Sequence, residues 1–462
     1  NVMRKISSCF ILIAGLFVFV TSHGSELVAP IERALKPIGD WKSTTTIYIA
    51  ENPETILFQN QPSKDLIPAS ITKVITAGAV LKHFPPGTKF KTQILAEGNN
   101  LFLKGGGDPG FVSETLWFLV NHFIRNGVKT VEGDIVVDDT LFDGLRFDPS
   151  RQKTRVDRAY DAPTSAMSFN WNSVNVFVRP GAKVGEPGRV FLDPENEYTS
   201  LRASVQTVAG AGNDLLVDRD ETKSGDVLIV KGKIGVNSSE VVVFKNITKP
   251  DLWAGAQLKS FLKQRGVDVK GKIRTGVVPA GAKVVAEVES KPIEQMVADM
   301  NKFSNNYVAE MLTKNLGVLQ GAPGTISKGI ETMRAYLKDL GVSADEARIL
   351  NPSGLTRDNR LSARALWKVL WDLDSQLAYQ PEFFASLPIA GVDGTLKRRM
   401  KGSPAERWVR AKTGYLDGVV SLAGYAGRKD GRVVTFVLIY NGSADEARVR
   451  NAFDDVMKVL VK

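Results

Sequence analysis

Pro68-Ala-Ser-Ile-Thr-Lys73 places a serine and a lysine three residues apart at the predicted start of a helix. Residues at this spacing are neighbours on one helix face, so the amine of Lys73 can reach the hydroxyl of Ser70. The unpaired N–H groups and the dipole at a helix start also favour negative charge that develops near Ser70. A serine hydroxyl becomes a good nucleophile only when a base takes its proton. The stretch therefore predicts a nucleophile, Ser70, with Lys73 as its base.

The lysine needs an unusual environment for this role. Its pKa must fall from about 10.4 to about 7.4 to act near neutral pH, which corresponds to about 4 kcal/mol. Burial and a nearby second cation both lower the pKa of a lysine, and Lys412 is the candidate for that cation. The same spacing recurs in Ser260-Phe-Leu-Lys263, where Ser260 falls in the middle of a predicted helix on its polar side. The Ser-x-x-Lys spacing alone therefore does not choose between the two serines.

Two further strings lie far along the chain, Ser304-Asn-Asn306 and Lys412-Thr-Gly414. Serine and asparagine disfavour helix interiors, so the first string is either a helix break or a functional group. In the functional interpretation its hydroxyl passes a proton and its amide holds a substrate carbonyl. The second string is either a strand end or a site where Lys412 and Thr413 bind a carboxylate. There Gly414 would let another backbone approach closely.

Other catalytic chemistries find little support in the sequence. Beyond residue 24 the chain keeps two histidines, His83 and His122, and it has no Gly-x-Ser-x-Gly string, which disfavours a histidine triad. The absence of His-Glu-x-x-His and of an acid–histidine cluster at ligand spacing disfavours a zinc peptidase. Gly105-Gly-Gly-Asp-Pro-Gly110 formally fits a dinucleotide loop. Its aspartate would oppose phosphate and its proline lacks an N–H, so we expect a tight turn instead.

Residues 1–24 have the layout of a secretory signal peptide. Arg4 and Lys5 precede an apolar run from Phe10 to Val20, which is shorter than the roughly 20 residues that span a bilayer. An uncleaved membrane anchor is the alternative. The single cysteine, Cys9, lies in this segment, so the processed chain would have no disulfide and no thiolate site. We expect an exported, periplasmic protein of a bacterial envelope, with no stable membrane insertion after cleavage.

The charge of the chain is basic. It is +10, and removal of residues 1–24 leaves +8, because two basic residues and no acid are lost. A basic exported protein can meet nucleic acid, anionic membrane or acidic cell-wall polymer. The lysines and arginines are scattered, and no nucleic-acid-binding motif appears. We therefore expect a solvated basic surface and no nucleic-acid partner.

The hydrophobic pattern predicts an outer domain in two segments, 25–87 and 289–462, with a mostly β region of one or two subdomains inserted at 88–288. An antiparallel sheet covered by helices is the implied α+β architecture. Strands are expected at 44–50, 55–58, 136–139, 174–178, 227–230, 241–244, 407–412, 419–426 and 432–440. Helices are expected after Pro68 and at 252–263, 293–316, 326–340 and 363–373.

A last helix is expected to start at Ser443, with Glu446 completing a capping box. Its apolar residues recur every three or four positions from Val449 to Leu460 and form one stripe. A membrane-surface helix is one interpretation of that stripe. Packing on the sheet is favoured, because the helix closely follows a hairpin marked by Asp430-Gly431 and its polar face mixes acids with bases.

With the three strings in this order, the sequence resembles the penicillin-recognising serine enzymes. It is most similar to the D-alanyl-D-alanine carboxypeptidase/endopeptidase family, peptidase family S13, which comprises low-molecular-mass class C penicillin-binding proteins of the penicillin-binding protein 4 type. The likeness covers nearly the whole chain after residue 24. It rests on Pro68-Ala-Ser-Ile-Thr-Lys73, Gly106-Gly-Asp-Pro109, Ala162-Pro-Thr-Ser-Ala166, Asn351-Pro-Ser-Gly-Leu-Thr-Arg357, Gly391-Val-Asp-Gly-Thr395 and Arg410-Ala-Lys-Thr-Gly414.

The resemblance implies a β-lactamase/transpeptidase-like fold with a large insertion between the first two motifs. It also implies the chemistry. Ser70 would attack the carbonyl of a D-Ala-D-X bond in peptidoglycan stem peptides, and Lys73 would take its proton. Ser304 would relay that proton to the leaving amine, while Asn306 orients the acyl side. Water would then hydrolyse the acyl-enzyme, and a β-lactam would leave a long-lived adduct. No metal or organic cofactor is implied.

The resemblance further assigns the binding strand. Lys412 and Thr413 would hold the terminal carboxylate of the substrate beside Gly414. The backbone N–H groups of Ser70 and Tyr415 would form the oxyanion hole, a device worth roughly 3–4 kcal/mol per donor.

The family also places an acidic residue of the inserted region against the side-chain amine of diaminopimelate, and Asp157 is our candidate for it. Two alternative functions stay open. The first is a β-lactamase on the same scaffold, which the long insertion and the lack of an identifiable deacylating acid disfavour. The second is a non-catalytic β-lactam-binding or cell-wall-binding protein, which the presence of every reactive side chain disfavours.

Overall fold

The computed structural model describes residues 23–154 and 161–462. All but the last two residues of the expected signal segment 1–24 lie outside the described residues, and so does Asp157. Within the described part of the chain, no helix combines the length and the apolar character needed to cross a membrane.

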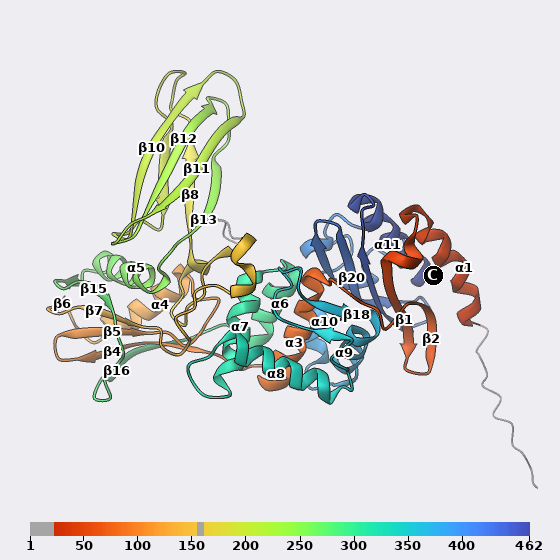
Figure 1. Cartoon of the computed structure of the whole chain (residues 1–462). Helices are drawn as coiled ribbons and strands as arrows, with labels where there is room; N and C mark the ends of the chain where they lie inside the picture. The colour runs from red at the N-terminus through yellow and green to blue at the C-terminus, as the bar shows by residue number, and fades with distance from the viewer. Residues whose placement is uncertain (1–22, 155–160) are drawn as a thin grey trace, which may run out of the picture.

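An antiparallel five-stranded sheet joins the two ends of the described chain, in the order β19-β20-β21-β1-β2 (Figure 1). Its strands are β1 (Thr45–Asn52), β2 (Thr55–Asn60), β19 (Val409–Leu416), β20 (Val419–Gly427) and β21 (Val433–Asn441). Ile47 of β1 lies opposite Leu438 of β21, so the N-terminal and C-terminal segments pair directly. The β-branched and aromatic residues that fill β21 suit a strand buried on both faces. The expected antiparallel sheet is confirmed.

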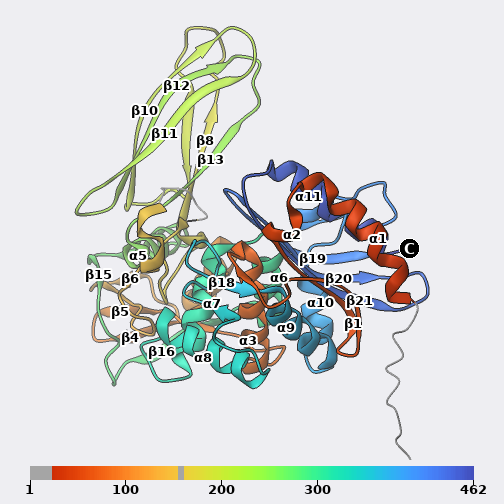
Figure 2. The same ribbon diagram turned by 45° about the vertical axis from the view of Figure 1, so that its right-hand side comes forward.

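Alternate residues of this sheet pack against helices on opposite faces, as the two-residue period of a strand requires. Ile47 belongs to the core under α1 (His23–Leu35) and α11 (Glu446–Leu460). Its neighbour Tyr48 belongs to the core shared with the helices of the other face. In Figure 2, α1 and α11 lie together on one side of the sheet. The last helix therefore packs on the sheet, as favoured from its sequence.

The layer on the other face is built around α3. Its helices are α3 (Thr72–His83), α6 (Ile293–Lys302), α7 (Asn306–Val318), α8 (Ile326–Asp339), α9 (Ala363–Ser375) and α10 (Gln380–Ser386). Every residue of α3 from Thr72 to Leu81 is buried. The polar residues Thr72, Lys73 and Thr76 are covered together with the apolar ones. Lys73 must therefore find its partners inside the protein.

The helix predicted at 293–316 is two helices, α6 and α7. The chain breaks at Ser304, whose φ is +54°, a left-handed conformation that is uncommon for residues other than glycine. The side chain of Asn305 then caps α7 by accepting a hydrogen bond from the N–H of Val308. The prediction of a continuous helix is wrong, and the interpretation of the Ser-Asn-Asn string as a helix break is confirmed.

The start of the last helix also differs from the expectation. α11 begins at Glu446 rather than at Ser443, and the side chain of Asp445 caps it by accepting a hydrogen bond from the N–H of Arg448 at 2.8 Å. The Glu446 carboxylate instead accepts a hydrogen bond from the N–H of Gly418, at the turn between β19 and β20. The predicted capping box is therefore wrong, because the glutamate is used in a tertiary contact.

Between α3 and α6 the chain contributes a mixed sheet in the order β15-β7-β5-β4-β16, whose strands β15 and β16 follow the rest of the inserted region. This sheet and its helices comprise β4 (Lys91–Glu97), β5 (Asn100–Lys104), β7 (Ile135–Asp138), β15 (Ile273–Thr275), β16 (Lys283–Glu289), α4 (Ser113–Ile124) and α5 (Pro250–Gln264). The expectation of a single helix in this region is wrong. The aromatic and β-branched residues of α4 are typical of strands, which hid its helical period.

A β lobe projects from this sheet and consists of two three-stranded sheets, β10-β12-β11 and β13-β8-β9 (Figure 1). Its strands are β8 (Ser173–Arg179), β9 (Arg189–Asp193), β10 (Thr199–Val208), β11 (Asn213–Glu221), β12 (Asp226–Gly235) and β13 (Val241–Asn246). The remaining short elements are α2 (Trp41–Thr44), β3 (Asp65–Leu66), β6 (Thr130–Val131), β14 (Asp268–Val269), β17 (Ala347–Arg348) and β18 (Arg360–Ser362). The domain boundaries at 88 and 288 stay predictions.

The cap of α11 can be tested by mutation. We expect Asp445→Ala to lower the free energy of unfolding by about 1 kcal/mol, because it removes the acceptor for a first-turn N–H. Ser443→Ala is the control, and it should leave the urea midpoint unchanged. If Ser443→Ala destabilises the protein and Asp445→Ala does not, the sequence-based capping box is right and the observed cap is wrong.

Candidate active site

Ser70 lies in a short 3₁₀ turn, Ala69–Ile71, that leads directly into α3. The preceding residue, Ala69, has a φ of +52°. The carbonyl of Pro68 accepts a hydrogen bond from the Ser421 hydroxyl of β20 at 2.7 Å, which ties this turn to the five-stranded sheet. The predicted position of Ser70 at a helix start is confirmed, and the side chain is half-buried there.

Lys73 lies one turn further along α3 and is fully buried. Its Nζ lies 3.1 Å from the Ser70 hydroxyl, 2.7 Å from Oδ1 of Asn306 and 2.6 Å from the carbonyl oxygen of Ser353. A neutral amine has two N–H groups and one lone pair. The side-chain oxygen of Asn306 and the carbonyl oxygen of Ser353 can only accept hydrogen bonds, so they take the two N–H groups. The lone pair of a neutral Lys73 is then left to face Ser70.

The electrostatics favour that neutral form. Burial lowers the pKa of Lys73 well below its usual value, and the cations of Lys412 and Arg151 lower it further. The carboxylate of Glu310 acts in the opposite direction. The structure thus brings Lys412 close enough to act as the predicted second cation.

Ser304 and Lys412 contact each other directly. The Lys412 ammonium donates to the Ser304 hydroxyl at 3.0 Å and to the carbonyl oxygen of Thr413 at 2.8 Å. Burial lowers the pKa of Lys412 to about 7. The break between α6 and α7 turns Ser304 toward this lysine, so the same string is both a helix break and part of the site.

β19 runs past the nucleophile with very little clearance. A Cβ added to Gly414 would lie 3.1 Å from the N atom of Ser70, 2.8 Å from the carbonyl oxygen of Pro68 and 2.1 Å from Oγ of Ser421. Glycine is therefore required for close approach, as predicted from the Lys-Thr-Gly string. The next residue, Tyr415, exposes about half of its side chain.

The neighbouring Thr413 hydroxyl contacts the hydroxyl of Thr395 at 2.8 Å. This contact joins the Gly391–Thr395 string to the binding strand. An oxyanion hole formed by the N–H groups of Ser70 and Tyr415 stays a prediction.

Ser353 is a site residue that the sequence reasoning missed. Its string, Asn351-Pro-Ser-Gly, was noted without a role. In the structure the Asn351 side chain accepts hydrogen bonds from both the N–H and the hydroxyl of Ser353, at 2.9 and 2.7 Å, and so fixes the carbonyl that faces Lys73. Gly354, with a φ of +79°, then passes close to the Ala69 carbonyl. Asn-Pro-Ser-Gly is a turn signal, but nothing in it indicates contact with a lysine 280 positions away.

A buried charge cluster lies next to Lys73 and was also missed. Arg151 donates to Glu310 at 2.6 Å and pairs with Asp161, and all three side chains are buried. Glu310 stands one turn after Asn306 on α7. The charges of Arg151 and Glu310 act on Lys73, and Asp161 is fixed by its pair with Arg151.

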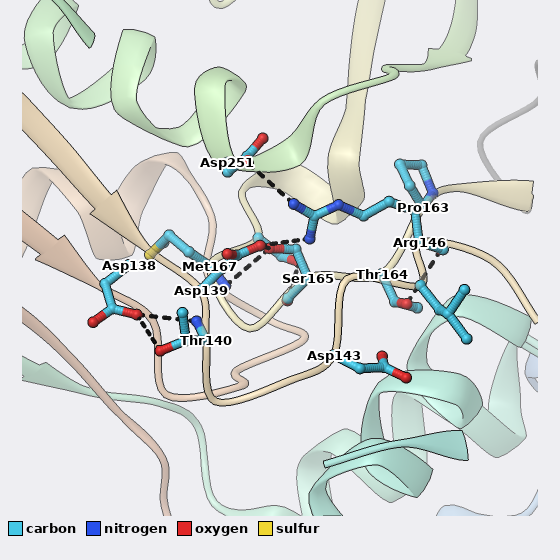
Figure 3. A network of polar contacts seen from close by, with 12 residues as sticks. Asp138, Asp139, Thr140, Asp143, Arg146, Pro163, Thr164, Ser165, Met167 and Asp251 are labelled. Carbon is cyan, nitrogen blue, oxygen red and sulfur yellow. Dashed lines mark hydrogen bonds and ion pairs between the residues drawn. The ribbon is translucent and has the colours of Figure 1, made fainter. Parts of the chain in front are cut away.

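Figure 3 shows a second polar network, which anchors the Ala162–Ala166 string. Arg146 contacts Asp139 at 2.5 Å and Asp251 at 3.0 Å, and its carbonyl accepts from the N–H of Thr164 at 2.7 Å. The Ser165 hydroxyl donates to Asp139 at 2.9 Å. These contacts hold the loop after β7 and the Ala162–Ala166 string together, so the string has a structural role.

The competing serine lies elsewhere. Ser260 is inside α5, where its hydroxyl donates to the carbonyl of Glu195 at 3.1 Å. The structure thus separates the two Ser-x-x-Lys strings, and only the one at Ser70 contacts the other two motifs. Among the described residues, no three His, Cys, Asp or Glu side chains gather as metal ligands would.

The close approach of β19 gives a test of this geometry. We expect Gly414→Ala to slow the acylation of Ser70 by a penicillin roughly 10- to 100-fold, because the added methyl group must push the strand away from the nucleophile. Gly144→Ala is the control, since a Cβ there meets nothing within 4 Å. Equal acylation rates for the two variants would contradict the observed clearance.

Comparison with known proteins gives a consistent result. A D-alanyl-D-alanine carboxypeptidase from Actinomadura sp. is 32% identical over 414 residues, which cover 85% of this chain and 76% of the relative. Penicillin binding protein 4 (dacB) from Haemophilus influenzae has a similar structure, with a TM-score of 0.78 and 21% identity over 94% of this chain and 99% of the other. A predatory endopeptidase from Bdellovibrio bacteriovorus matches with a TM-score of 0.53 and 16% identity, over 90% of this chain and 93% of the other.

These structural matches confirm the expected penicillin-recognising fold. The model of the D-Ala-D-Ala carboxypeptidase 3 (S13) family matches residues 33–461, nearly the whole described chain. The chain belongs to the D-Ala-D-Ala carboxypeptidase 3 (S13) family.

Proposed function

We propose that the protein is a serine-type D-Ala-D-Ala carboxypeptidase and DD-endopeptidase. It cleaves stem peptides and cross-links of peptidoglycan through an acyl-enzyme on Ser70, and β-lactams inhibit it covalently. The observation that carries this proposal is the placement of the Lys73 amine between the Ser70 hydroxyl and two carbonyl oxygens. Membership of the carboxypeptidase family supports the substrate class.

Acylation begins with neutral Lys73. Its lone pair takes the proton of Ser70 as Oγ bonds to the carbonyl carbon of the scissile amide. The side-chain oxygen of Asn306 and the carbonyl of Ser353 accept hydrogen bonds from the amine before the transfer and from the ammonium after it. Lys73 therefore keeps both hydrogen-bond acceptors in its neutral and its charged state, so the proton transfer needs little reorganisation of the site.

Release of the amine uses the other side of the site. When the C–N bond breaks, the proton passes from Lys73 through the Ser304 hydroxyl to the leaving nitrogen. The Lys412 ammonium orients that hydroxyl, and together with Thr413 it holds the carboxylate of the leaving residue. Charge-assisted contacts of this kind are stronger than neutral hydrogen bonds and select substrates that end in a carboxylate.

Water completes the cycle by adding to the ester carbonyl, with Lys73 again as the base. A peptide amine diffuses away before this step. The amine of an opened β-lactam stays attached to the acyl group and continues to occupy the leaving-group side. The adduct on Ser70 should therefore persist.

The cellular setting belongs to the same proposal. We place the protein in the periplasm, exported by residues 1–24, with peptidoglycan as its substrate and no nucleic-acid partner. Asp157 is proposed to bind the side-chain amine of diaminopimelate. The buried pair of Arg151 and Asp161 supports that assignment, because Arg151 acts on the charge of Lys73.

Intact mass spectrometry of the protein after incubation with a penicillin tests the reaction. We expect an added mass of one penicillin per chain, carried by the peptide that contains Ser70. Ser70→Ala should abolish the adduct. Ser260→Ala is the matched control, because it disrupts the other Ser-x-x-Lys string, and it should acylate like the unmodified protein.

The competing functions predict different masses. Rapid consumption of penicillin without a lasting adduct indicates a β-lactamase and contradicts the peptidase proposal. No reaction at all indicates a non-catalytic binding protein, provided that the sample is folded by circular dichroism. Purified cross-linked muropeptides then separate the two peptidase activities. Cleavage of the cross-link reports the endopeptidase, and release of terminal D-alanine reports the carboxypeptidase.

A further inference from the structure

A cavity of about 850 Å³ opens beside Ser304 and is not used by the reaction described above. Its lining residues come from the turn between α6 and α7, the start of α4 and the β lobe. Phe303 and Ser304 line it from the turn, Glu114 from α4, and Phe244 from β13. Ser304 belongs both to this cavity and to the contact with Lys412, so the cavity adjoins the leaving-group side of the site.

The cavity is larger than the leaving group that a carboxypeptidase must accommodate. A carboxypeptidase releases one D-alanine, which has only a few heavy atoms. Sites of roughly 300–1,000 Å³ normally enclose ligands of several rings. The cavity therefore has room for a larger part of the polymeric substrate than its terminal residue.

The backbone at Trp171 is strained in a way that presents this side chain to the cavity. Asn170, Trp171 and Asn172 all have left-handed φ values, +47°, +52° and +49°. Asparagine tolerates this conformation, but for tryptophan it is costly, and residues of this kind cluster at ligand clamps. The turn is held by the Asn170 side chain, which accepts from the N–H of Ser113 and donates to its hydroxyl, both at 3.0 Å. The Trp171 ring stays 45% exposed.

Two more aromatic rings are exposed along the same cavity. Phe303 is 70% exposed and Phe244 is 52% exposed. Exposed large apolar side chains that gather at one site mark a binding surface rather than a core. Flat aromatic faces of this kind stack on sugar rings, because the C–H groups on one face of a sugar form an apolar patch that packs against the electron-rich face of the aromatic ring.

The polar groups of the cavity disfavour an anionic ligand and can accept hydrogen bonds from hydroxyl and amide groups. Glu114, Asp193 and Asp299 supply three carboxylates, against the single ammonium of Lys291. This wall is negative although the whole chain is basic, with a charge of +10. Carboxylates accept hydrogen bonds from sugar hydroxyls and amides, and they repel the free carboxylates of stem peptides.

We propose that this cavity binds the glycan strand of peptidoglycan, a chain of N-acetylated amino sugars, with Trp171 as its main stacking surface. The inference rests on the proposed function, because it assumes that the substrate is cell-wall polymer. It adds a site that would favour polymeric substrate over free stem peptide.

Calorimetric titration with a β-1,4-linked tetramer of N-acetylglucosamine tests the site without any peptide. We expect the unmodified protein to bind the tetramer and Trp171→Gly to bind it at least about tenfold more weakly, a loss of about 1.4 kcal/mol. Glycine suits the left-handed backbone at this position, so the change removes the ring without adding strain. Trp408→Ala is the matched control, since Trp408 is 47% exposed and does not line the cavity. It should bind like the unmodified protein.

Penicillin acylation of the same samples separates this inference from the proposed function. An adduct on Ser70 together with no tetramer binding, or with equal binding by all variants, overturns the glycan site alone. No adduct on the unmodified protein overturns the proposed function. If Trp171→Gly does not fold, Phe244→Ala provides the test, with the same expected weakening. Trp171-dependent binding of a lysine-containing tetrapeptide in place of the tetramer would assign the cavity to cationic peptides and contradict the proposal.

Discussion

The buried amine of Lys73 is the group around which the site is built. A charged ammonium is costly in the protein interior, and a neutral amine still needs acceptors for two N–H groups. Asn306 and Ser353 supply those acceptors from α7 and from the loop before β18. Three segments that are far apart in the sequence must therefore meet within hydrogen-bonding distance of one side chain. The geometry that satisfies the lysine also leaves its lone pair facing Ser70.

The fold supplies the rigidity that this arrangement needs. α3 is covered on every side from Thr72 to Leu81, so its first turn cannot shift without disturbing the core. Gly414 lets β19 lie against the Ser70 turn, and the Ser421 hydroxyl ties the same turn to β20. The inserted region supplies the buried Arg151, which pairs with Glu310 of α7, and part of the lining of the cavity that we assign to glycan.

Local signals in the sequence were sufficient for part of this picture. The spacing of Ser70 and Lys73 and the strand composition of β21 depend on near neighbours, and both predictions were confirmed. The start of α11 was misplaced because Ser443 looks like a cap, whereas Asp445 takes that role and Glu446 reaches β19–β20. Ser353 and Arg151 were missed because their partners lie 280 and 159 residues away. The catalytic roles themselves, and the role of Asp157, stay predictions.

The pH dependence of Ser70 acylation by a penicillin tests the central claim, a neutral Lys73 base, most directly. The rate constant should rise with pH through the lowered pKa of Lys73, since only the neutral amine accepts a proton. It should fall again as Lys412 loses its charge near its pKa of about 7. Lys412→Arg keeps a cation at all relevant pH values and should remove the falling limb. A rate that continues to rise toward the ordinary lysine pKa, about 10.4, would show that Lys73 is charged near neutral pH and would contradict a neutral Lys73 base.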